Sequence, residues 1–256
     1  MIKDSLLDVK SITAGYTYYS NVPVISDISF SLNSGDILGV CGRNGSGKST
    51  ITSAIFGICQ LYQGRISLSG EQLDHRPLYY RAQKGIRLLP QNWQVFPALT
   101  VLENLAIPIY DPYTASDYRQ LMQQIDYVLE KMTRNIQTFW INNISSRFLN
   151  VAGELSGGER QILALMRALL GYVKVLLLDE PLQHLSSDLH GSVCYTLKAF
   201  CSKPERAIVL VEHDLNFIKQ TCNKFLLIDD GKILLEGDQS SIHKLSEHYN
   251  NLTNLT

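Results

Sequence analysis

The first hundred residues contain short apolar runs of about strand length, separated by polar turns. Two of them, "LLDVKSI" (6–12) and "DISFSL" (27–32), alternate between apolar and polar positions, as strands with one buried face do. A third, "DILGVCG" (36–42), leads into a glycine loop, and the following "KSTITSAIFGI" (48–58) has helical composition and stops near Gly57. Further strands are expected at "GRISLSG" (64–70) and "GIRLLPQ" (85–91).

The middle of the chain has a different pattern. From about Pro108 to Asn150 it is polar, with apolar residues at helical spacing on one face. These residues are Leu121, Ile125, Val128, Leu129 and Met132. The pattern predicts an inserted helical subdomain, which we place at 108–155.

The last hundred residues alternate between strand and helix patterns. Helical stretches begin near Ser156, Ser186 and Asp214. The apolar strands beside them are "KVLLLD" (174–179), "AIVLVE" (207–212) and "KFLLID" (224–229). Such alternation requires a parallel sheet covered by helices, so the fold class is α/β. We expect 1–107 and 156–246 to form one core, and the polar tail 247–256 to fray.

Composition narrows the class of protein. The 256 residues are 45% hydrophobic and 18% charged, and 23 basic against 24 acidic side chains leave a formal net charge of -1 without a basic block. Nucleic acid is therefore not an expected partner.

The apolar runs are far shorter than the roughly 20 residues of a membrane-spanning helix. The N-terminus lacks the zones of a signal peptide, and the five cysteines show no C-x-x-C spacing, so we expect a cytosolic chain without disulfides or zinc.

The stretch "GRNGSGKST" (42–50) matches the phosphate-binding pattern G-x-x-x-x-G-K-[ST] between a predicted strand and a predicted helix. Its glycines let backbone N–H groups turn toward phosphate oxygens, and the helix N-terminus adds its positive end. We expect Lys48 to reach the β- and γ-phosphates of ATP, and Ser49 to ligate Mg²⁺ with Thr50 nearby. The other nucleotide-binding candidates are Gly42, Asn44, Gly45 and Gly47.

Two adjacent acids, Asp179 and Glu180, end the apolar strand "VLLLDE" (175–180). Uncompensated charges are costly beside a buried strand, so this pair indicates a metal or a reaction. Asp179 is placed to hold Mg²⁺ through its water shell, and Glu180 to polarise the attacking water as general base. The alternative is an ordinary pair of acids that face solvent.

A second glycine turn opens a helix at "LSGGERQ" (155–161), and here the chain resembles the nucleotide-binding subunits of ATP-binding cassette (ABC) transporters, whose signature this is. The resemblance covers about 6–242. It implies a P-loop NTPase fold with a mainly parallel sheet core, an N-terminal antiparallel β-subdomain and an inserted helical subdomain. In the family, this turn binds the γ-phosphate of ATP held by the other subunit of a head-to-tail dimer. Ser156, Gly157 and Gly158 would thus serve the partner's ATP, whereas alone they would more often be a helix cap.

The resemblance also implies three further site residues. Gln91 looks like the glutamine that touches Mg²⁺ and senses the γ-phosphate. His213, in "LVEHDL", is similar to the switch histidine that contacts the γ-phosphate and helps position the water. Tyr16 resembles the aromatic residue that stacks on adenine, a role that Tyr18 or Tyr19 could fill instead.

One position departs from the family's pattern. Five residues after the proline of "DEP" the family usually has an aspartate, in a loop that crosses the dimer interface. This chain has Ser186 there, with Asp188 two residues later. Communication between the two ATP sites could differ, or Ser186 could simply cap the following helix.

The chain contains nothing that could itself carry a solute across a membrane, so the resemblance implies separate transmembrane permease subunits. We expect them to dock on Gln91–Ile107, because Trp93, Val95, Phe96 and Leu99 make this stretch dense in apolar residues. Ordinary packing between the sheet and the helical insertion is the alternative. The protein would then lie at the cytoplasmic face of the membrane and act with a second cassette, identical or different.

The sequences of three motifs are most similar to those in the ATPases of branched-chain amino acid importers. They are "FPALTVLENL" (96–105), "LSGGERQILALMRALL" (155–170) and "LVEHDL" (210–215). The ATPases of exporters of lipid, drug or peptide share these motifs, so an exporter ATPase is a second hypothesis. A soluble cassette ATPase without a transport role is a third. A module that holds ATP without turnover is disfavoured by Glu180 and His213.

Overall fold

The structure is a computed structural model that describes residues 5–16, 22–92, 95–109 and 118–253. Its larger sheet has six strands in the order β10-β9-β3-β8-β7-β6, and only the β9–β10 pair is antiparallel. The strands are β3 (Ile37–Gly42), β6 (Ile86–Leu89), β7 (Val175–Asp179), β8 (Ala207–Val211), β9 (Lys224–Asp229) and β10 (Lys232–Asp238). β3, β7 and β8 are buried along their whole length, as parallel strands covered on both faces are. The mainly parallel core is therefore confirmed.

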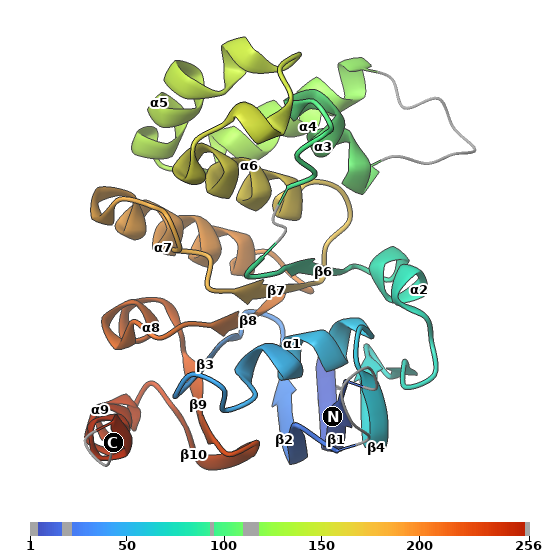
Figure 1. The fold of residues 1–256 in the computed structure, drawn as a ribbon, viewed down its shortest axis with the longest axis vertical. Helices are drawn as coiled ribbons and strands as arrows, with labels where there is room; N and C mark the ends of the chain where they lie inside the picture. The colour runs from blue at the N-terminus through green and yellow to red at the C-terminus, as the bar shows by residue number, and fades with distance from the viewer. Residues whose placement is uncertain (1–4, 17–21, 93–94, 110–117, 254–256) are drawn as a thin grey trace.

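A second, four-stranded sheet of order β2-β1-β4-β5 is antiparallel throughout. Its strands are β1 (Leu7–Gly15), β2 (Ile25–Leu32), β4 (Gln60–Leu68) and β5 (Glu71–Gln72). This confirms the N-terminal antiparallel β-subdomain. The helix α1 (Lys48–Phe56) lies between the sheets in Figure 1, because Ile51, Ala54 and Ile55 pack in one apolar cluster with residues of both. It ends at Gly57, as the sequence predicts.

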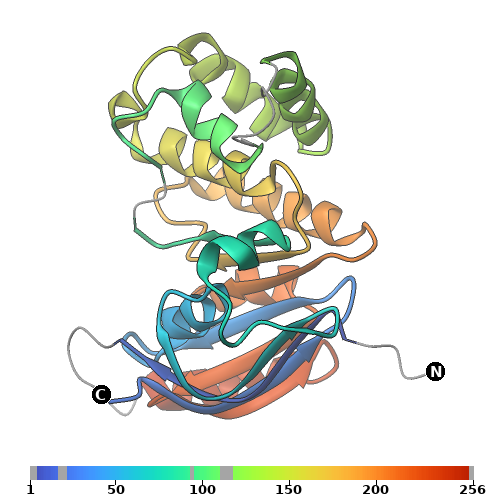
Figure 2. The same ribbon diagram turned by 90° about the vertical axis from the view of Figure 1, so that its right-hand side faces the viewer.

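Helices gather above the larger sheet, as the views in Figures 1 and 2 show. They are α3 (Val101–Ala106), α4 (Tyr118–Glu130), α5 (Arg134–Asn143) and α6 (Gly157–Leu169), with short 3-10 turns at Ile107–Ile109, Ser145–Arg147 and Ala152–Glu154. Leu121, Ile125 and Met132 are buried, and Val128 and Leu129 pack against the same core, so the apolar face predicted for this region exists.

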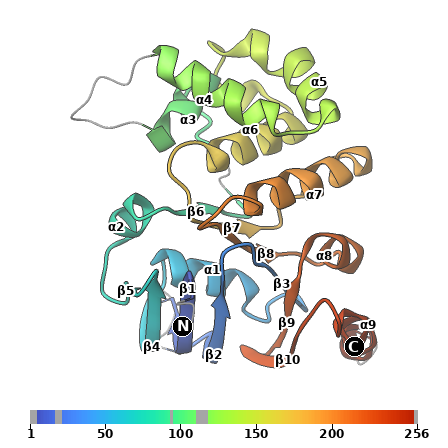
Figure 3. The same cartoon turned by 180° about the vertical axis from the view of Figure 1, so that it is seen from behind.

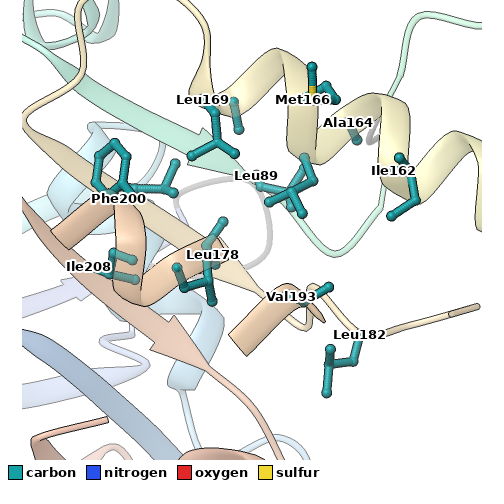
Figure 4. Close-up of a cluster of buried hydrophobic side chains, with 14 of the residues drawn as sticks. Leu89, Ile162, Ala164, Met166, Leu169, Leu178, Leu182, Val193, Phe200 and Ile208 are labelled. Carbon is teal, nitrogen blue, oxygen red and sulfur yellow. The ribbon is translucent and has the colours of Figure 1, made fainter. Parts of the chain in front are cut away.

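The helical layer and the sheet share one large core. α6 and α7 (Ser187–Cys201) lie over β6 and β7, and Figure 4 shows Ile162 and Met166 of α6, Leu89 of β6 and Leu178 of β7 within this cluster. The same core includes Phe200 at the end of α7. The sheet edge that carries Gln91 and the strand end that carries Glu180 are thereby fixed relative to the signature helix α6.

Some elements were not predicted from the sequence. They are β5, β10, α2 (Leu78–Gln83) and α3, while α8 (Leu215–Thr221) begins after Asp214 as expected. The expectation that the tail frays is wrong for its described part, because α9 (Ile242–Thr253) is helical. Leu245 is buried, and Tyr249 and Leu252 pack on the core, so an apolar stripe holds this polar helix in place. Figure 3 shows α9 beside β9 and β10. No helix formed by the described residues is long and apolar enough to cross a bilayer.

Candidate nucleotide-binding and hydrolysis site

The phosphate-binding loop joins β3 to α1. Gly47 occupies the N-cap position of α1 with φ 100°, a backbone conformation that side chains disfavour, and a Cβ there would lie 2.7 Å from Cγ2 of Ile25. No side chain caps this helix, and its first turn contains no acidic residue. The first N–H groups of α1 and the positive end of the helix are thus presented to an incoming anion.

Lys48 is the first residue of α1, and its side chain turns back into the loop. Nζ donates hydrogen bonds to the carbonyl oxygens of Gly42 at 2.9 Å and Arg43 at 2.7 Å, which holds the loop around the ammonium. Burial lowers the pKa of Lys48, whereas the carboxylates of Glu180 and Asp179 raise it. The result is a buried cation with carboxylates nearby, at the place where the sequence predicts phosphates.

A cavity of about 750 Å³ opens above this loop. It is lined by Tyr16, Val24, Arg43, Asn44, Gly45, Gly47, Lys48, Ser49, Thr50, Gln91, Glu180, His213 and Tyr249. Ten of these residues belong to the predicted site. The structure adds Val24, Arg43 and Tyr249, which the sequence analysis missed. We call this space the nucleotide cavity.

The two acids at the end of β7 have different surroundings. Glu180 has φ 51° and lines the nucleotide cavity, where its Oε2 accepts a 2.8 Å hydrogen bond from Nε2 of Gln91. Asp179 is only 5% exposed, and burial raises its pKa to about 6, although a hydrogen bond with the Ser49 side chain acts in the opposite direction. The sequence prediction that these adjacent acids are unlike ordinary surface carboxylates fits this geometry.

The residues proposed to hold Mg²⁺ fit that ion. Oδ1 of Asp179 is buried without a hydrogen-bond partner, and the Ser49 hydroxyl interacts with the same carboxylate. Mg²⁺ prefers oxygen ligands and is typically held by one or two carboxylates together with waters and substrate phosphates. The described residues form no cluster of three or more His, Cys, Asp or Glu side chains. Mg²⁺ binding at this site does not need such a cluster, because waters and phosphates supply the remaining ligands.

His213 follows β8 and projects into the nucleotide cavity with its side chain 65% exposed. Its neighbour Glu212, which the sequence analysis did not single out, is buried. One Glu212 oxygen accepts the backbone N–H of Leu182 at 3.2 Å, and the other accepts that of His213 at 3.2 Å. Burial raises the pKa of Glu212. This carboxyl group ties the segment after Glu180 to the segment that carries His213.

Two tyrosines contribute aromatic rings to the nucleotide cavity. Tyr16 follows β1, and its hydroxyl donates a hydrogen bond to Oγ of Ser53 at 3.2 Å. Tyr249 comes from α9, more than two hundred residues later in the chain. The alternatives Tyr18 and Tyr19 lie outside the described residues.

The signature turn lies apart from the nucleotide cavity of its own chain. Ser156 caps α6 in a reciprocal arrangement with Glu159: the Ser156 hydroxyl accepts the Glu159 N–H at 3.3 Å, and the Glu159 carboxylate accepts the Ser156 N–H at 2.7 Å. Gly157 lines a different cavity of about 480 Å³, beside Gln91 and Gln183. Of the residues that line these two cavities, only Gln91 belongs to both.

The loop after Glu180 packs against this turn. A Cβ on Gly157 would lie 3.2 Å from Cβ of His184, and His184 itself has φ 65°. Ser186 takes the N-cap position of α7 but forms no side-chain capping bond, and Asp188 lies in the first turn of that helix. Ser186 is therefore at the expected helix start without the hydrogen bond that a capping serine usually makes.

The stretch proposed for docking is only partly exposed. Val95 is 7% exposed and belongs to the core, so for this residue the alternative of ordinary packing is correct. Phe96 is 50% exposed, with the Arg167 guanidinium 5.1 Å from its ring centroid. Leu99 is partly buried, and Trp93 lies outside the described residues. A reciprocal cap of Thr100 and Glu103 then begins α3.

Comparison with known proteins identifies related chains. A protein-family model described as "ABC transporter" matches residues 25–183. The chain is 30% identical over 230 residues to the probable branched-chain amino acid transport ATP-binding protein LivF of Archaeoglobus fulgidus, covering 90% of this chain and 91% of that protein. It is 32% identical over 228 residues to the lipopolysaccharide export system ATP-binding protein LptB of Haemophilus influenzae, covering 88% of each.

Solved structures share the fold. An ATP-binding subunit of an ABC transporter superposes with a TM-score of 0.79 at 23% identity, over 97% of this chain and all of that one. A dimeric ATP-binding cassette in a post-hydrolysis state bound to ADP and Pi gives a TM-score of 0.78 at 20% identity, over 91% of this chain and 98% of that one.

Proposed function

Because this chain belongs to the ABC transporter family and is an ATPase subunit of that family, we propose that two cassettes close head to tail around ATP and drive separate membrane subunits. Each ATP would lie between the nucleotide cavity of one chain and the signature turn of the other. The observation that carries this proposal is the separation of Ser156–Gly158 from the nucleotide cavity of their own chain. The second cassette is either a copy of this chain or a related one.

The N-terminus of α6 supports a role for its turn in binding an anion from outside the chain. Its reciprocal cap uses the N–H groups of Ser156 and Glu159, whereas the glycines between them leave the backbone accessible. Gly157 already lies against His184, so a larger residue at position 157 would displace the loop after Glu180, which carries His184. A γ-phosphate brought by a partner cassette would meet the positive end of α6 at this point.

The side chains of the nucleotide cavity account for hydrolysis. Lys48 and the loop N–H groups hold the phosphates, and Tyr16 or Tyr249 offers a face to the adenine. Gln91 orients Glu180 through their hydrogen bond, and Glu180 accepts a proton from the attacking water as general base. His213, held at its backbone by Glu212, contacts the γ-phosphate and helps position that water.

Ser49, Gln91 and Asp179 would hold Mg²⁺ beside the phosphates. When bound, the ion neutralises charge that develops on the phosphate oxygens. The buried oxygen of Asp179 that has no partner supports this assignment. The Ser49 hydroxyl is oriented toward the same carboxylate.

Phe96 is the exposed apolar residue that we propose as the contact with the membrane subunits, so the chain would lie peripherally at the cytoplasmic face. The change Phe96→Asp should reduce copurification with membranes severalfold and leave basal ATP hydrolysis near normal, because a charge replaces half-exposed apolar area. Membrane flotation of the expressed protein measures this. Tyr195→Asp, at a similarly exposed aromatic residue on α7, is the matched control. Full copurification of Phe96→Asp with membranes would contradict this contact, and lost hydrolysis in the same variant would mean that Phe96 serves the ATPase core instead.

For the cargo, we propose import of amino-acid-like solutes. The names of two relatives support this: LivF, and the branched-chain amino acid transport ATP-binding protein BraG of Pseudomonas aeruginosa, which is 32% identical over 219 residues. Deletion of this gene should abolish uptake of radiolabelled leucine, isoleucine or valine. The similarity to LptB supports an exporter as the second candidate. Unchanged amino-acid uptake with altered surface lipid would favour that candidate.

A further inference from the structure

A second cavity, of about 430 Å³, lies between α4 and α7. Its walls come from α4 and the residue after it, the end of α6 and the turn that follows, the C-terminal half of α7 and the segment after α7. No lining residue is shared with the nucleotide cavity. Its volume lies within the range of small-molecule sites in proteins. We call it the α4/α7 cavity.

The interior of the α4/α7 cavity is apolar. Leu169 and Phe200, both labelled in Figure 4, are 9% and 5% exposed and line it together with Val128 and Ala199. Tyr127 and Tyr172 add aromatic rings near the surface, where both remain more than 45% exposed. Such a surface favours a ligand with an apolar body.

Three cations line the same cavity: Lys131, Lys203 and Arg206. The lining residues include no aspartate or glutamate, and among the described residues none of the three cations forms an ion pair. Glu205 is adjacent to Arg206 in the sequence, but it pairs with Lys174 at 3.2 Å instead. Positive charge is therefore concentrated here without a counter-charge among the described lining residues.

Aromatic rings hold these cations at the cavity. Nζ of Lys203 lies 4.2 Å from the ring centroid of Tyr127 and hydrogen-bonds its hydroxyl. The Arg206 guanidinium lies 4.5 Å from the ring centroid of Phe200, and burial lowers its pKa. Cation–π contacts orient the charges but do not neutralise them, so an anion would gain both Coulomb attraction and hydrogen bonds.

We propose that the α4/α7 cavity binds a small organic acid, a carboxylate carried on an aromatic or branched aliphatic body. The body would lie on Leu169 and Phe200, and the carboxylate would face Lys203 and Arg206. The Gln124 side chain already accepts the Gly171 N–H at 3.1 Å, which links α4 to the turn after α6. A bound acid would add contacts between α4 and α7, and would therefore stabilise the helical layer on the core.

The test uses the full chain and three ligands with the same body: 4-phenylbutyrate, 4-phenylbutanol and 4-phenylbutylamine. Isothermal titration should show saturable binding of the acid, at least tenfold weaker binding of the alcohol, and none of the amine. The acid should also raise the melting temperature. Equal affinity for acid and alcohol would overturn the proposal, because the cations would then contribute nothing.

Two variants test the location of this site. Lys203→Ala should weaken binding of the acid about tenfold, and Ala199→Phe should abolish it by filling the cavity. Lys198→Ala, on α7 outside the cavity lining, is the control and should bind as the unchanged chain does. Unchanged ATP affinity in every variant shows that each one folds. Binding that survives both Lys203→Ala and Ala199→Phe would overturn the proposal.

A last comparison distinguishes a small acid from an anionic membrane surface as the ligand of these cations. Vesicles of phosphatidylglycerol should not displace 4-phenylbutyrate, because a recess of this size admits a free molecule and not a bilayer surface. Displacement by vesicles would show that the cations bind a membrane, and would overturn the assignment to a small acid.

Discussion

α1 and α6 both begin at a glycine turn, yet their N-termini are built differently. α1 starts at Gly47 without a side-chain cap, opens into the nucleotide cavity and has a buried lysine as its first residue. α6 starts at Ser156 with a reciprocal cap, and Arg147 pairs with its Glu159 at 3.2 Å. The α6 cap occupies the N–H groups of Ser156 and Glu159 and lies outside the nucleotide cavity of its own chain, whereas the α1 terminus has no side-chain cap and opens into that cavity.

This difference teaches that a glycine turn before a helix does not by itself define a phosphate site. Local surroundings decide: α1 is accompanied by Lys48, Glu180 and Gln91 in one cavity, but α6 faces the loop that carries His184. Among the described residues, those of the α6 turn do not line the nucleotide cavity of their own chain. If it binds phosphate, the phosphate comes from a second cassette.

The largest expected effect concerns ATP hydrolysis in the nucleotide cavity, into which the N-terminus of α1 opens. Glu180→Gln should lower turnover about 10²- to 10⁴-fold, which is the usual contribution of a general base, and leave ATP affinity nearly unchanged. Phosphate release measured at saturating ATP gives the rate. A decrease in turnover of less than tenfold would mean that another residue is the general base.

The buried Asp179 carboxyl group beside the start of α1 should cost stability when it ionises. Because burial raises the pKa of Asp179 from 3.8 to about 6, ionisation opposes folding, and the free energy of unfolding should decrease as pH rises from 4 through 6. Asp179→Asn should therefore be more stable than the unchanged chain at pH 7.5, by up to about 3 kcal/mol. That difference should shrink at pH 5. Urea unfolding without nucleotide at both pH values measures it, and a destabilised variant at pH 7.5 would contradict it.

Lys48→Ala should weaken ATP binding about 10- to 100-fold, because the phosphates lose a buried charged donor. Calorimetric titration gives the affinity. Lys219→Ala, in the last turn of α8, is a control for the loss of one positive charge. Equal affinities for the two variants would remove Lys48 from the site.

The smallest effect is expected at α6. Glu159→Gln removes the ion pair with Arg147 but keeps a side chain able to cap, so it should cost about 0.5 kcal/mol of unfolding free energy. Urea unfolding checks this value. ATP affinity of the isolated chain should stay the same, because α6 does not line the nucleotide cavity. Weaker ATP binding by the monomer would mean that both turns serve one chain.

Much of the fold was readable from the sequence for physical reasons. β3, β7 and β8 are continuous apolar runs because both faces are buried, and α1 ends where Gly57 adopts φ 92°. The tail was misjudged because its composition is polar. Its helix depends on three apolar residues that meet the core: Leu245, Tyr249 and Leu252.

The candidate site was predictable where one short segment contains the chemistry, as around Lys48 and Glu180. Tyr249 reaches the nucleotide cavity only through the path of the whole chain, so no local pattern indicates it. Glu212 directly precedes His213 in the sequence. Its position at the end of an apolar strand is the sequence feature that indicates a buried functional carboxyl group. Apolar density alone did not separate buried Val95 from exposed Phe96.

The central claim is that the α6 turn closes the ATP site of another cassette, and size-exclusion chromatography with light scattering tests it most directly. Glu180→Gln should elute as a dimer with ATP and as a monomer without it, because nucleotide binding energy becomes dimerisation energy. Adding Ser156→Arg should abolish this dimer while each monomer still binds ATP, whereas adding Ser202→Arg after α7 should leave it intact. A Glu180→Gln protein that stays monomeric with ATP, or a Ser156→Arg double variant that still dimerises, would contradict the account.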